Sequence, residues 1–313
     1  MNSRPVTSLK LQAAYQHCGQ IMRHHSRSYY LGTLAMTPEK RRAIWAVYTW
    51  CRTVDDLVDE GESAVQIAAQ LDAAAADLEK TFSSQPQQLV DIALADTVER
   101  FALEITPFQD MLKGQRMDLE KNRYATFAEL ELYCYRVAGT VGLMSVQILN
   151  ETPAQGDRSV EGQERLKGAL ALGTANQLTN IIRDVAEDCG RDRVYLPLQE
   201  LHAFHYTEAE LFQGVLDDRW QALMQFQVQR ARDYYQQAED RLYLLNRDSR
   251  RAVRIALSLY RSILDRVEEN NYDVFSSRLY VPQFQKISCI VSSHLNLKVP
   301  LKVPNFWQSL LAS

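Results

Sequence analysis

The stretches CRTVDDLVDE, residues 51–60, and NQLTNIIRDVAEDCGRD, residues 176–192, carry the pattern that decides the fold of this chain. In both, oxygen-bearing side chains recur every fourth residue, namely Asp55 and Asp59 in the first and Asn180, Asp184 and Asp188 in the second. On an α-helix this spacing places the side chains on one face. Apolar residues lie between them, so each acidic face borders a core, where a carboxylate is costly unless something positive compensates it. We therefore expect two helices whose oxygen ligands face each other.

Two facing columns of carboxylate and amide oxygens would form a cage for hard divalent cations. Mg²⁺ prefers oxygen ligands and commonly bridges protein carboxylates to substrate phosphates. Carboxylates four residues apart on a helix also repel one another, which is a reason to expect a bound cation. Arg52 and Arg183 add fixed positive charge within the same stretches. The pattern therefore indicates diphosphate chemistry, and the alternative interpretation is a pair of solvated helix faces.

Bulk properties exclude several classes of protein. The chain has 313 residues, 46% of them hydrophobic, and a net charge of −4 with both signs interspersed, which is typical of a soluble globular protein without a nucleic-acid partner. Its five scattered cysteines indicate free thiols in a reducing compartment. We find neither a run of 18 apolar residues nor a signal-peptide core, so we expect a cytoplasmic protein without a transmembrane helix. The apolar segment at 287–311 is either a tail packed on the body or a peripheral membrane contact.

Helical periodicity dominates the chain, and no alternating strand pattern is present. We expect helices at 38–58, about 67–78, 126–150, 161–189, 217–245 and 249–269, with breaks near 83–88, 151–160 and 190–206. Thr37 followed by Pro38 is a helix-start signal, and Thr126 with Glu129 forms a capping box. No low-complexity linker divides the sequence. The prediction is an all-α single domain over residues 1–313, with its core at about 15–290.

Four longer strings resemble a known family. They are YYLGTLAMTPEKRRAIWAVYTWCRTVDDLVDE at 29–60, GQRMDLEKNRYATFAELELYCYRVAGTVGLMSV at 114–146, ANQLTNIIRDVAEDCGRDRVYLP at 175–197 and SLYRSILDRVEENNYDVFSSRLYV at 258–281. In this order they are similar to the conserved regions of the squalene/phytoene synthase family, over about residues 20 to 285. The resemblance implies an isoprenoid-synthase helical bundle around a central cavity. It also implies head-to-head condensation of two prenyl diphosphates, with two or three Mg²⁺ or Mn²⁺ ions bound to the diphosphates.

The resemblance carries site residues over by position. It implies metal ligation by Asp55, Asp59, Asn180, Asp184 and Asp188, and counts Asp55, Asp59 and Asp184 as catalytic together with Tyr133. It implies substrate binding by His25, Ser26, Arg27, Ser28, Tyr29, Tyr48, Arg52, Val137, Val141, Gly142, Gln177, Arg183, Tyr260 and Arg278. The phenol of Tyr133 can stabilise a carbocation through its ring or relay a proton, and the alternative is a core tyrosine. Gly139 and Gly142 either leave room for a prenyl chain or allow close helix packing.

One departure and one absence refine these expectations. Asp56 stands where the family commonly has Glu, which keeps the charge. The dinucleotide fingerprint G-x-G-x-x-G is absent, so no nicotinamide cofactor is expected. The strings outside the acidic motifs favour the C20 branch, in which two geranylgeranyl diphosphates give phytoene through prephytoene diphosphate in carotenoid biosynthesis.

Two alternatives remain at this point. One is a C15 enzyme making presqualene diphosphate, dehydrosqualene or squalene, since sequence does not reveal cavity depth. The other is an idle relative that binds prenyl lipids or scaffolds a complex. The partners expected are the prenyl diphosphates, a peripheral membrane contact and a downstream carotenoid desaturase, and the oligomeric state is open.

Overall fold

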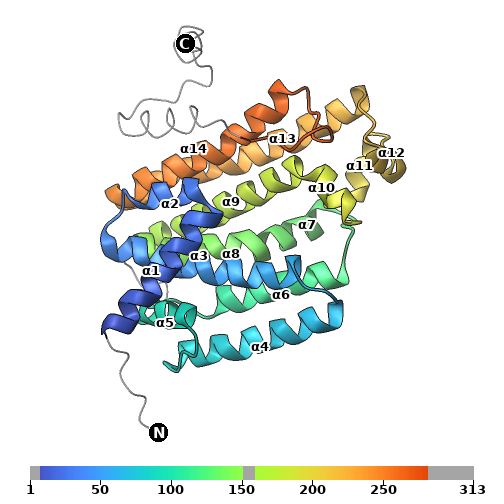
Figure 1. Ribbon diagram of the computed structural model, residues 1–313. Helices are drawn as coiled ribbons and strands as arrows, with labels where there is room; N and C mark the ends of the chain where they lie inside the picture. Colours follow the sequence, from blue (N-terminus) through green and yellow to red (C-terminus); the bar gives the residue numbers. More distant parts are fainter. Residues whose placement is uncertain (1–7, 151–158, 281–313) are drawn as a thin grey trace, which may run out of the picture.

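The computed structural model describes residues 8–150 and 159–280, which fold almost entirely into helices (Figure 1). In chain order these are α1 Ser8–His25, α2 Arg27–Thr33, α3 Pro38–Asp59, α4 Ala64–Phe82, α5 Leu89–Phe101, α6 Thr106–Glu120, α7 Phe127–Cys134, the π-helical turn η1 Tyr135–Gly139, α8 Thr140–Asn150, α9 Val160–Arg183, α10 Val185–Gly190, α11 Leu198–Ala203, α12 Glu208–Gln213, α13 Asp218–Glu239, the 3₁₀ turn η2 Leu242–Leu244 and α14 Arg247–Glu269. The expected all-α class is therefore confirmed.

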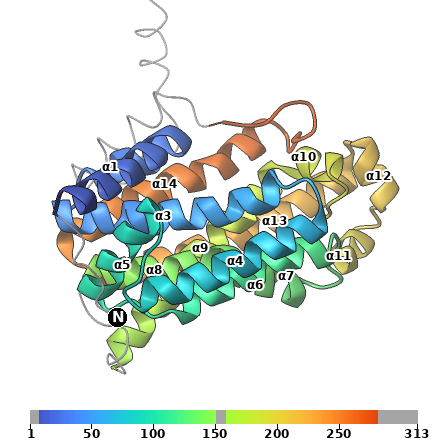
Figure 2. The same ribbon diagram turned by 60° about the horizontal axis from the view of Figure 1, so that its bottom comes forward.

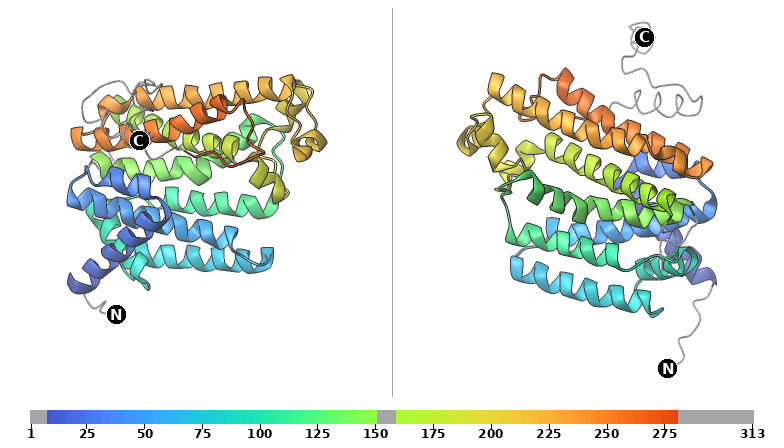
Figure 3. Two further views of the ribbon diagram at one scale, coloured as in Figure 1. Left: turned by 45° about the horizontal axis from the view of Figure 1, so that its top comes forward. Right: turned by 180° about the vertical axis from the view of Figure 1, so that it is seen from behind.

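The long helices lie side by side along one direction of the molecule, with α9 near the middle (Figure 1 and Figure 2). On one side α9 packs against α13 and α14, and on the other it packs against η1 and α8. Beyond α8 lie α3 and α6, and α4 covers their outer side (Figure 3). This order places the helix of the first acidic motif, α3, and that of the second, α9, on either side of α8. The two motifs can therefore face one space from opposite walls.

Local sequence signals explain where the key helices begin. The Thr37 hydroxyl accepts a hydrogen bond from the backbone of Lys40, and Pro38 occupies the first position of α3. Thr126 caps α7 by accepting from the backbone of Glu129. The start of α3 at Pro38 is the predicted one, and α7 starts at Phe127, one residue after the predicted 126. Both helices carry residues of the site, so their caps help to fix its position.

Three predicted helices differ from the structure in ways that matter for the site. The helix expected at 161–189 ends at Arg183, and Asp184 has φ −101° and ψ 14° before α10 begins. The helix expected at 217–245 ends at Glu239. The helix expected at 126–150 contains the π-helical turn η1, directly after Tyr133 and Cys134. Such turns often occur at functional sites, and periodicity in sequence does not reveal them.

Two glycines allow the central helices to touch. A Cβ atom on Gly142 would lie 2.3 Å from the carbonyl oxygen of Ala169, and a Cβ on Gly173 would lie 2.3 Å from that of Ala138. Real Cβ atoms do not approach oxygen this closely, so a side chain at Gly142 would force α8 and α9 apart, and one at Gly173 would force η1 and α9 apart. Gly142 packs closely against α9 and also lines the tunnel, so its role in leaving room for a prenyl chain stays a prediction.

Phe127–Asn150 is a continuous helical stretch of 24 residues with a mean hydropathy of 1.2, and by length and composition alone it could cross a membrane. Half of its apolar window is buried, as in the core helix of a soluble protein, so this is weak support for a span. The stretch contains Glu129, Glu131 and Arg136, so it is not a run of 18 apolar residues, and the expectation of no transmembrane helix stays a prediction. The apolar segment at 287–311 lies outside the described residues.

Candidate active site

Two connected cavities lie between the central helices. An apolar tunnel of about 460 Å³ is enclosed by residues of α2, α3, α8, α9 and α14. A polar chamber of about 300 Å³ lies at the ends of α3, α6 and α9. Arg52, Asp55, Val137 and Asn180 line both cavities, so these four residues mark the neck that joins them. A molecule with a charged head and a long apolar tail matches this division.

The first acidic motif lies on one unbroken helix. Asp55 and Asp59 both line the polar chamber, and Asp55 accepts a hydrogen bond of 2.6 Å from the side-chain amide of Gln115. Burial, and then the neighbouring charge of Asp59, raise the pKa of Asp55 to about 7. The carboxylate is therefore held where its negative charge is poorly compensated. A cation at this position would relieve that deficit.

The second acidic motif straddles the break between α9 and α10. Asn180, Asp184 and Asp188 all line the chamber. Burial and the charge of Asp184 raise the pKa of Asp188 to about 7. The side-chain oxygen of Asn180 is buried and has no hydrogen-bond partner, although its amide nitrogen lies 3.4 Å from the oxygen of Gln177. A buried oxygen without a partner is costly, and a bound ion or substrate group would satisfy it.

Arginines surround these carboxylates. Asp184 is bracketed by Arg183, whose Nε lies 2.7 Å from Oδ1, and by Arg278, whose Nε lies 3.0 Å from the same oxygen. Arg278 also reaches Glu187 at 3.0 Å. Arg52 forms an ion pair with Asp56 one turn along α3. The chamber therefore contains planar guanidinium groups beside its acidic residues, and guanidinium groups suit diphosphate oxygens.

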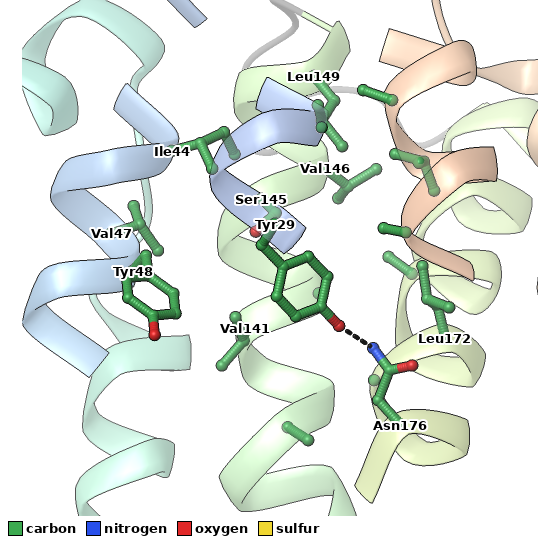
Figure 4. Close-up of a pocket in the computed structure, with 18 of the residues that line it drawn as sticks. Tyr29, Ile44, Val47, Tyr48, Val141, Ser145, Val146, Leu149, Leu172 and Asn176 are labelled. Carbon is green, nitrogen blue, oxygen red and sulfur yellow. Dashed lines mark hydrogen bonds between the residues drawn. The ribbon is translucent and has the colours of Figure 1, made fainter. Parts of the chain in front are cut away.

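Three tyrosines stand near the neck on the tunnel side. Tyr29 and Tyr260 stack with ring centroids 5.1 Å apart, and Tyr48 lines the same wall. The Tyr29 hydroxyl accepts a hydrogen bond of 3.2 Å from the amide of Asn176, as Figure 4 shows. Deeper in the tunnel, the apolar side chains that Figure 4 labels include Val141, Val146, Leu149 and Leu172. The aromatic groups therefore lie where the polar and apolar parts of a ligand would meet.

The predicted site residues fall into two groups. Those brought together around the two cavities are Tyr29, Tyr48, Arg52, Asp55, Asp59, Tyr133, Val137, Val141, Gly142, Gln177, Asn180, Arg183, Asp184, Asp188, Tyr260 and Arg278. Among the described residues, His25, Ser26 and Arg27 do not line either cavity, and His25 and Arg27 are exposed. The contact of His25, Ser26, Arg27 and Ser28 with diphosphate, like the other roles, stays a prediction.

Sequence reasoning missed several polar residues of the chamber. Gln115 and Asp118 lie three apart on α6, and Arg193 and Tyr195 follow α10. The Tyr133 hydroxyl donates to Asp118 at 2.9 Å, and so does that of Tyr195. The i, i+3 spacing of Gln115 and Asp118 inside the string GQRMDLEKN was a signal that could have placed both on one face.

The donor set of the chamber suits a hard divalent cation. Carboxylate and amide oxygens are the ligands that Mg²⁺ prefers, and the unpartnered oxygen of Asn180 and the raised pKa of Asp55 both call for positive charge. Within the described part of the chain, no three acidic, histidine or cysteine side chains converge on one point. Ligation would therefore have to combine protein oxygens with those of a bound diphosphate.

Comparison with known proteins now decides the family. The squalene/phytoene synthase family model matches residues 22–285. The chain belongs to the squalene/phytoene synthase family. It is 50% identical over 302 residues to the 15-cis-phytoene synthase of Synechococcus elongatus, which covers 95% of this chain and 98% of that relative. It is 49% identical over 304 residues to the 15-cis-phytoene synthase of Synechocystis, covering 95% and 89%.

Comparison with a solved structure shows that this chain also has the squalene/phytoene synthase fold. A crystal structure of a dehydrosqualene synthase in complex with a ligand superposes with a TM-score of 0.83 at 30% identity, covering 92% of this chain and 98% of that one. The predicted resemblance and fold are thereby confirmed. The chain is a prenyltransferase, and enzymes of this family use prenyl diphosphates and generally need a divalent metal ion.

Proposed function

We propose that this chain is a phytoene synthase of carotenoid biosynthesis. It joins two geranylgeranyl diphosphates head to head through prephytoene diphosphate and releases two diphosphates. The observation that carries the proposal is the junction of a charged chamber with an apolar tunnel at Asp55 and Asn180. Identity of about 50% to 15-cis-phytoene synthases over nearly the whole chain supports the C20 substrate and the product.

The arginines of the chamber bind and orient the diphosphate heads. Arg52, Arg183 and Arg278 present planar donor groups to phosphate oxygens. Each is paired with a carboxylate in this structure, so diphosphate binding exchanges an Asp partner for a phosphate partner. The charge that develops on the leaving group is stabilised by donors already in place, which is the usual source of large rate effects.

Asp55, Asp59, Asn180, Asp184 and Asp188 would hold Mg²⁺ or Mn²⁺ together with the diphosphates. When bound, these ions neutralise the leaving diphosphate as its C–O bond ionises. The residues themselves keep the oxygen donors on two opposite walls of the chamber. Gln115 fixes the orientation of Asp55 through its 2.6 Å hydrogen bond. No nicotinamide cofactor enters this scheme.

The tunnel holds the prenyl tails and excludes water from the cation that forms at the neck. Val137 and Val141 continue one apolar wall from the neck inward. Tyr29, Tyr48 and Tyr260 present aromatic rings beside the neck, where a ring face can stabilise an allylic cation. Excluding water matters because water would capture the cation before the second prenyl group attacks it.

The test is an assay of the purified protein with Mg²⁺ or Mn²⁺ and either geranylgeranyl or farnesyl diphosphate, with and without NADPH. A C40 hydrocarbon from the C20 substrate, independent of NADPH, is the expected result. Product from the C15 substrate alone would assign the chain to the branch of the dehydrosqualene synthase that it resembles in structure at 30% identity. Absence of diphosphate release from both substrates would favour an idle lipid-binding relative.

A water-insoluble product also needs an outlet. The proposal includes a cytoplasmic protein that touches a membrane peripherally and passes phytoene to a membrane-bound desaturase. Sedimentation of the full chain with lipid vesicles, before and after turnover, tests this step. A protein that stays in the supernatant in both cases would contradict it.

A further inference from the structure

Asp118 receives two phenol hydrogen bonds inside the polar chamber. The Tyr133 hydroxyl donates to Oδ2 and the Tyr195 hydroxyl to Oδ1, both at 2.9 Å. The two phenol oxygens lie 3.3 Å apart. Tyr133 and Tyr195 are buried, with stacked rings whose centroids lie 5.1 Å apart. The three side chains therefore form one hydrogen-bonded group, and all three line the chamber.

A second pair on the same helices shows what this arrangement looks like without a cavity. The Tyr135 hydroxyl donates to Asp110 on α6 at 2.8 Å, and Lys113 pairs with Asp110 at 2.7 Å. Neither Tyr135 nor Asp110 lines the tunnel or the chamber. Partial burial raises the pKa of Asp110, but the hydrogen bonds from Lys113 and Tyr135 outweigh it and bring the pKa below its usual range. This outer pair is a salt-bridged surface contact.

The inner pair differs in charge balance. Burial raises the pKa of Asp118, and Arg193 and the two phenols offset only part of that effect. Asp59 adds a like charge nearby, whereas Arg193 supplies positive charge. A carboxylate of this kind accepts a proton more readily than the outer Asp110 does. The same Tyr–Asp hydrogen bond is therefore suited to proton transfer at Asp118 and not at Asp110.

The proposed reaction, on which this inference rests, has to dispose of a proton at the neck. After the first ionisation, the double bond of the second prenyl group attacks C1 of the allylic cation and leaves a tertiary cation. Closing the cyclopropane ring requires loss of one C1 proton. Tyr133 lies one turn before Val137, which lines both cavities, so its hydroxyl is near the place where this C–H bond breaks. Burial raises the pKa of Tyr133, so the phenol is neutral and must lose its own proton as it gains another.

We propose that Tyr133 and Asp118 form a proton relay, with Asp118 as the positioning residue and terminal proton acceptor and Tyr195 holding its carboxylate in place. The C1–H bond breaks, and its electron pair forms the third bond of the cyclopropane ring. The proton passes to the Tyr133 oxygen, while the proton of that phenol passes to Oδ2 of Asp118. Oδ1 stays bonded to Tyr195 throughout. Atoms and charge balance, because one cation is neutralised and one carboxylate becomes a carboxylic acid.

The diphosphate released in the first step could also accept the C1 proton. The fraction of ionised substrate that goes on to condensed product distinguishes this acceptor from Asp118. Without an acceptor for the C1 proton, the donor still ionises, but water or diphosphate captures the cation. The measurement is the ratio of condensed product, prephytoene diphosphate plus phytoene, to diphosphate released, with Mg²⁺ and geranylgeranyl diphosphate. Asp118→Asn, which keeps the shape and removes the acceptor, should lower this ratio by about 100-fold. Deuterium at C1 of the substrate should lower it further.

Matched variants separate a relay from a structural role. Tyr133→Phe should reproduce the Asp118→Asn partition, and the double variant should be no worse than either, because the two groups act in one step. Tyr195→Phe, which spares the Tyr133–Asp118 bond, should lower the ratio by less. Tyr135→Phe in the outer pair should keep the ratio of the wild type. Continued diphosphate release and an unchanged helical circular dichroism spectrum establish that each variant folds and binds substrate.

Two outcomes would overturn the relay. If Asp118→Asn keeps the wild-type ratio at full turnover, the released diphosphate takes the proton. If diphosphate release and condensation fall in parallel, so that the ratio is unchanged, Asp118 only shapes the chamber. Failure of the proposed function is a separate result, since it appears in the wild type as no C40 product from the C20 substrate. In that case the same ratio is measured with farnesyl diphosphate, whose condensation loses the same C1 proton.

Discussion

The polar chamber and the apolar tunnel share helices α3 and α9, and they use different parts of each. On α3 the chamber takes Asp59 and Asp55, and the tunnel takes Tyr48 and then Ile44 further back along the helix. From Asp59 to Ile44 is about 22 Å at 1.5 Å per residue. The change from carboxylate to hydrocarbon along one rigid rod fixes where a charged head and an apolar tail must lie.

The second wall repeats this arrangement with a difference. On α9 the chamber takes Asn180 and Gln177, and the tunnel takes Leu172 and Ala169. Here the acidic end is interrupted at Asp184, where α9 stops and two arginines approach. The chamber therefore combines one rigid acidic wall with one that is locally broken and already charge-paired. The tunnel side of α9 has no such break, because Leu172 and Ala169 lie within the continuous helix Val160–Arg183.

The largest effect should follow from removing chamber carboxylates. Asp55→Ala or Asp184→Ala should lower turnover by at least about 1,000-fold, because the leaving diphosphate loses part of its charge stabilisation. Helix content by circular dichroism should stay unchanged. The control is Asp72→Ala on α4, where the side chain is 73% exposed and paired with Arg116. Equal activity of the Asp55 or Asp184 variant and the wild type would contradict the assignment of the chamber as the diphosphate site.

The tunnel should respond in selectivity more than in rate. Ser145 is a small residue on the tunnel wall, as Figure 4 shows, so Ser145→Phe should shorten the space for a tail. We expect kcat/KM for geranylgeranyl diphosphate relative to farnesyl diphosphate to fall by about 10-fold or more, since apolar pockets discriminate by fit. The matched control is Ser258→Phe on α14, a partly exposed serine that does not line the tunnel. An equal loss with both substrates would mean that the tail does not reach this wall.

This contrast also explains what sequence could predict. The chamber was largely predictable, because the four-residue spacing of Asp55 and Asp59 identifies the first acidic motif. The four strings that resemble the family indicate most of its other residues. Spacing could have placed Asp118 beside Gln115 on one face of α6. Its contacts with Tyr133 and Tyr195 depend on how α6, α7 and the segment after α10 pack together, which no local pattern encodes. The break at Asp184 was missed because periodicity continues through it.

The tunnel was harder to read than the chamber. Apolar residues at helical spacing look the same whether they fill a core or line a cavity. Gly142 shows the limit clearly: its sequence context allowed two roles, and only the structure shows that it both packs against Ala169 and lines the tunnel. Tunnel depth is a property of several helices together, so neither the all-α class nor the motif positions determine it.

A smaller effect should come from replacing the guanidinium group at the neck with an ammonium group. Arg52→Lys keeps a positive charge but loses the planar fork that pairs with Asp56 in this structure and would present two N–H groups to a phosphate. We expect kcat/KM to fall by roughly 10-fold, with little change in the ratio of C20 to C15 activity. Steady-state kinetics with both substrates measure this. Unchanged kinetics would show that Arg52 acts only as the ion-pair partner of Asp56.

The smallest effect should appear in stability, and it separates the two cavities without any substrate. The pKa of Asp55 and that of Asp188 are raised from 3.8 to about 7 in the folded chain. Between about pH 4 and pH 7 the folded state therefore holds protons that the unfolded state has lost, so these groups make stability fall as pH rises. Metal-free protein should have a lower Tm at pH 8 than at pH 5.5 for this reason. Mg²⁺ should raise Tm more at pH 8, because it binds the deprotonated carboxylates.

Difference measurements isolate the contribution of the chamber from that of other titrating groups. Metal-free Asp55→Asn should have a Tm at least about 2 °C above that of the wild type at pH 8, and the gap should shrink at pH 5.5, where Asp55 is itself protonated. Ser145→Phe changes only the tunnel, so its Tm difference from the wild type should be the same at both pH values. If Asp55→Asn is less stable than the wild type at pH 8 without metal, the carboxylate is already compensated by Arg52 and Gln115. The charges of the chamber would then be balanced without a metal ion. The chamber would differ from the tunnel only in being polar.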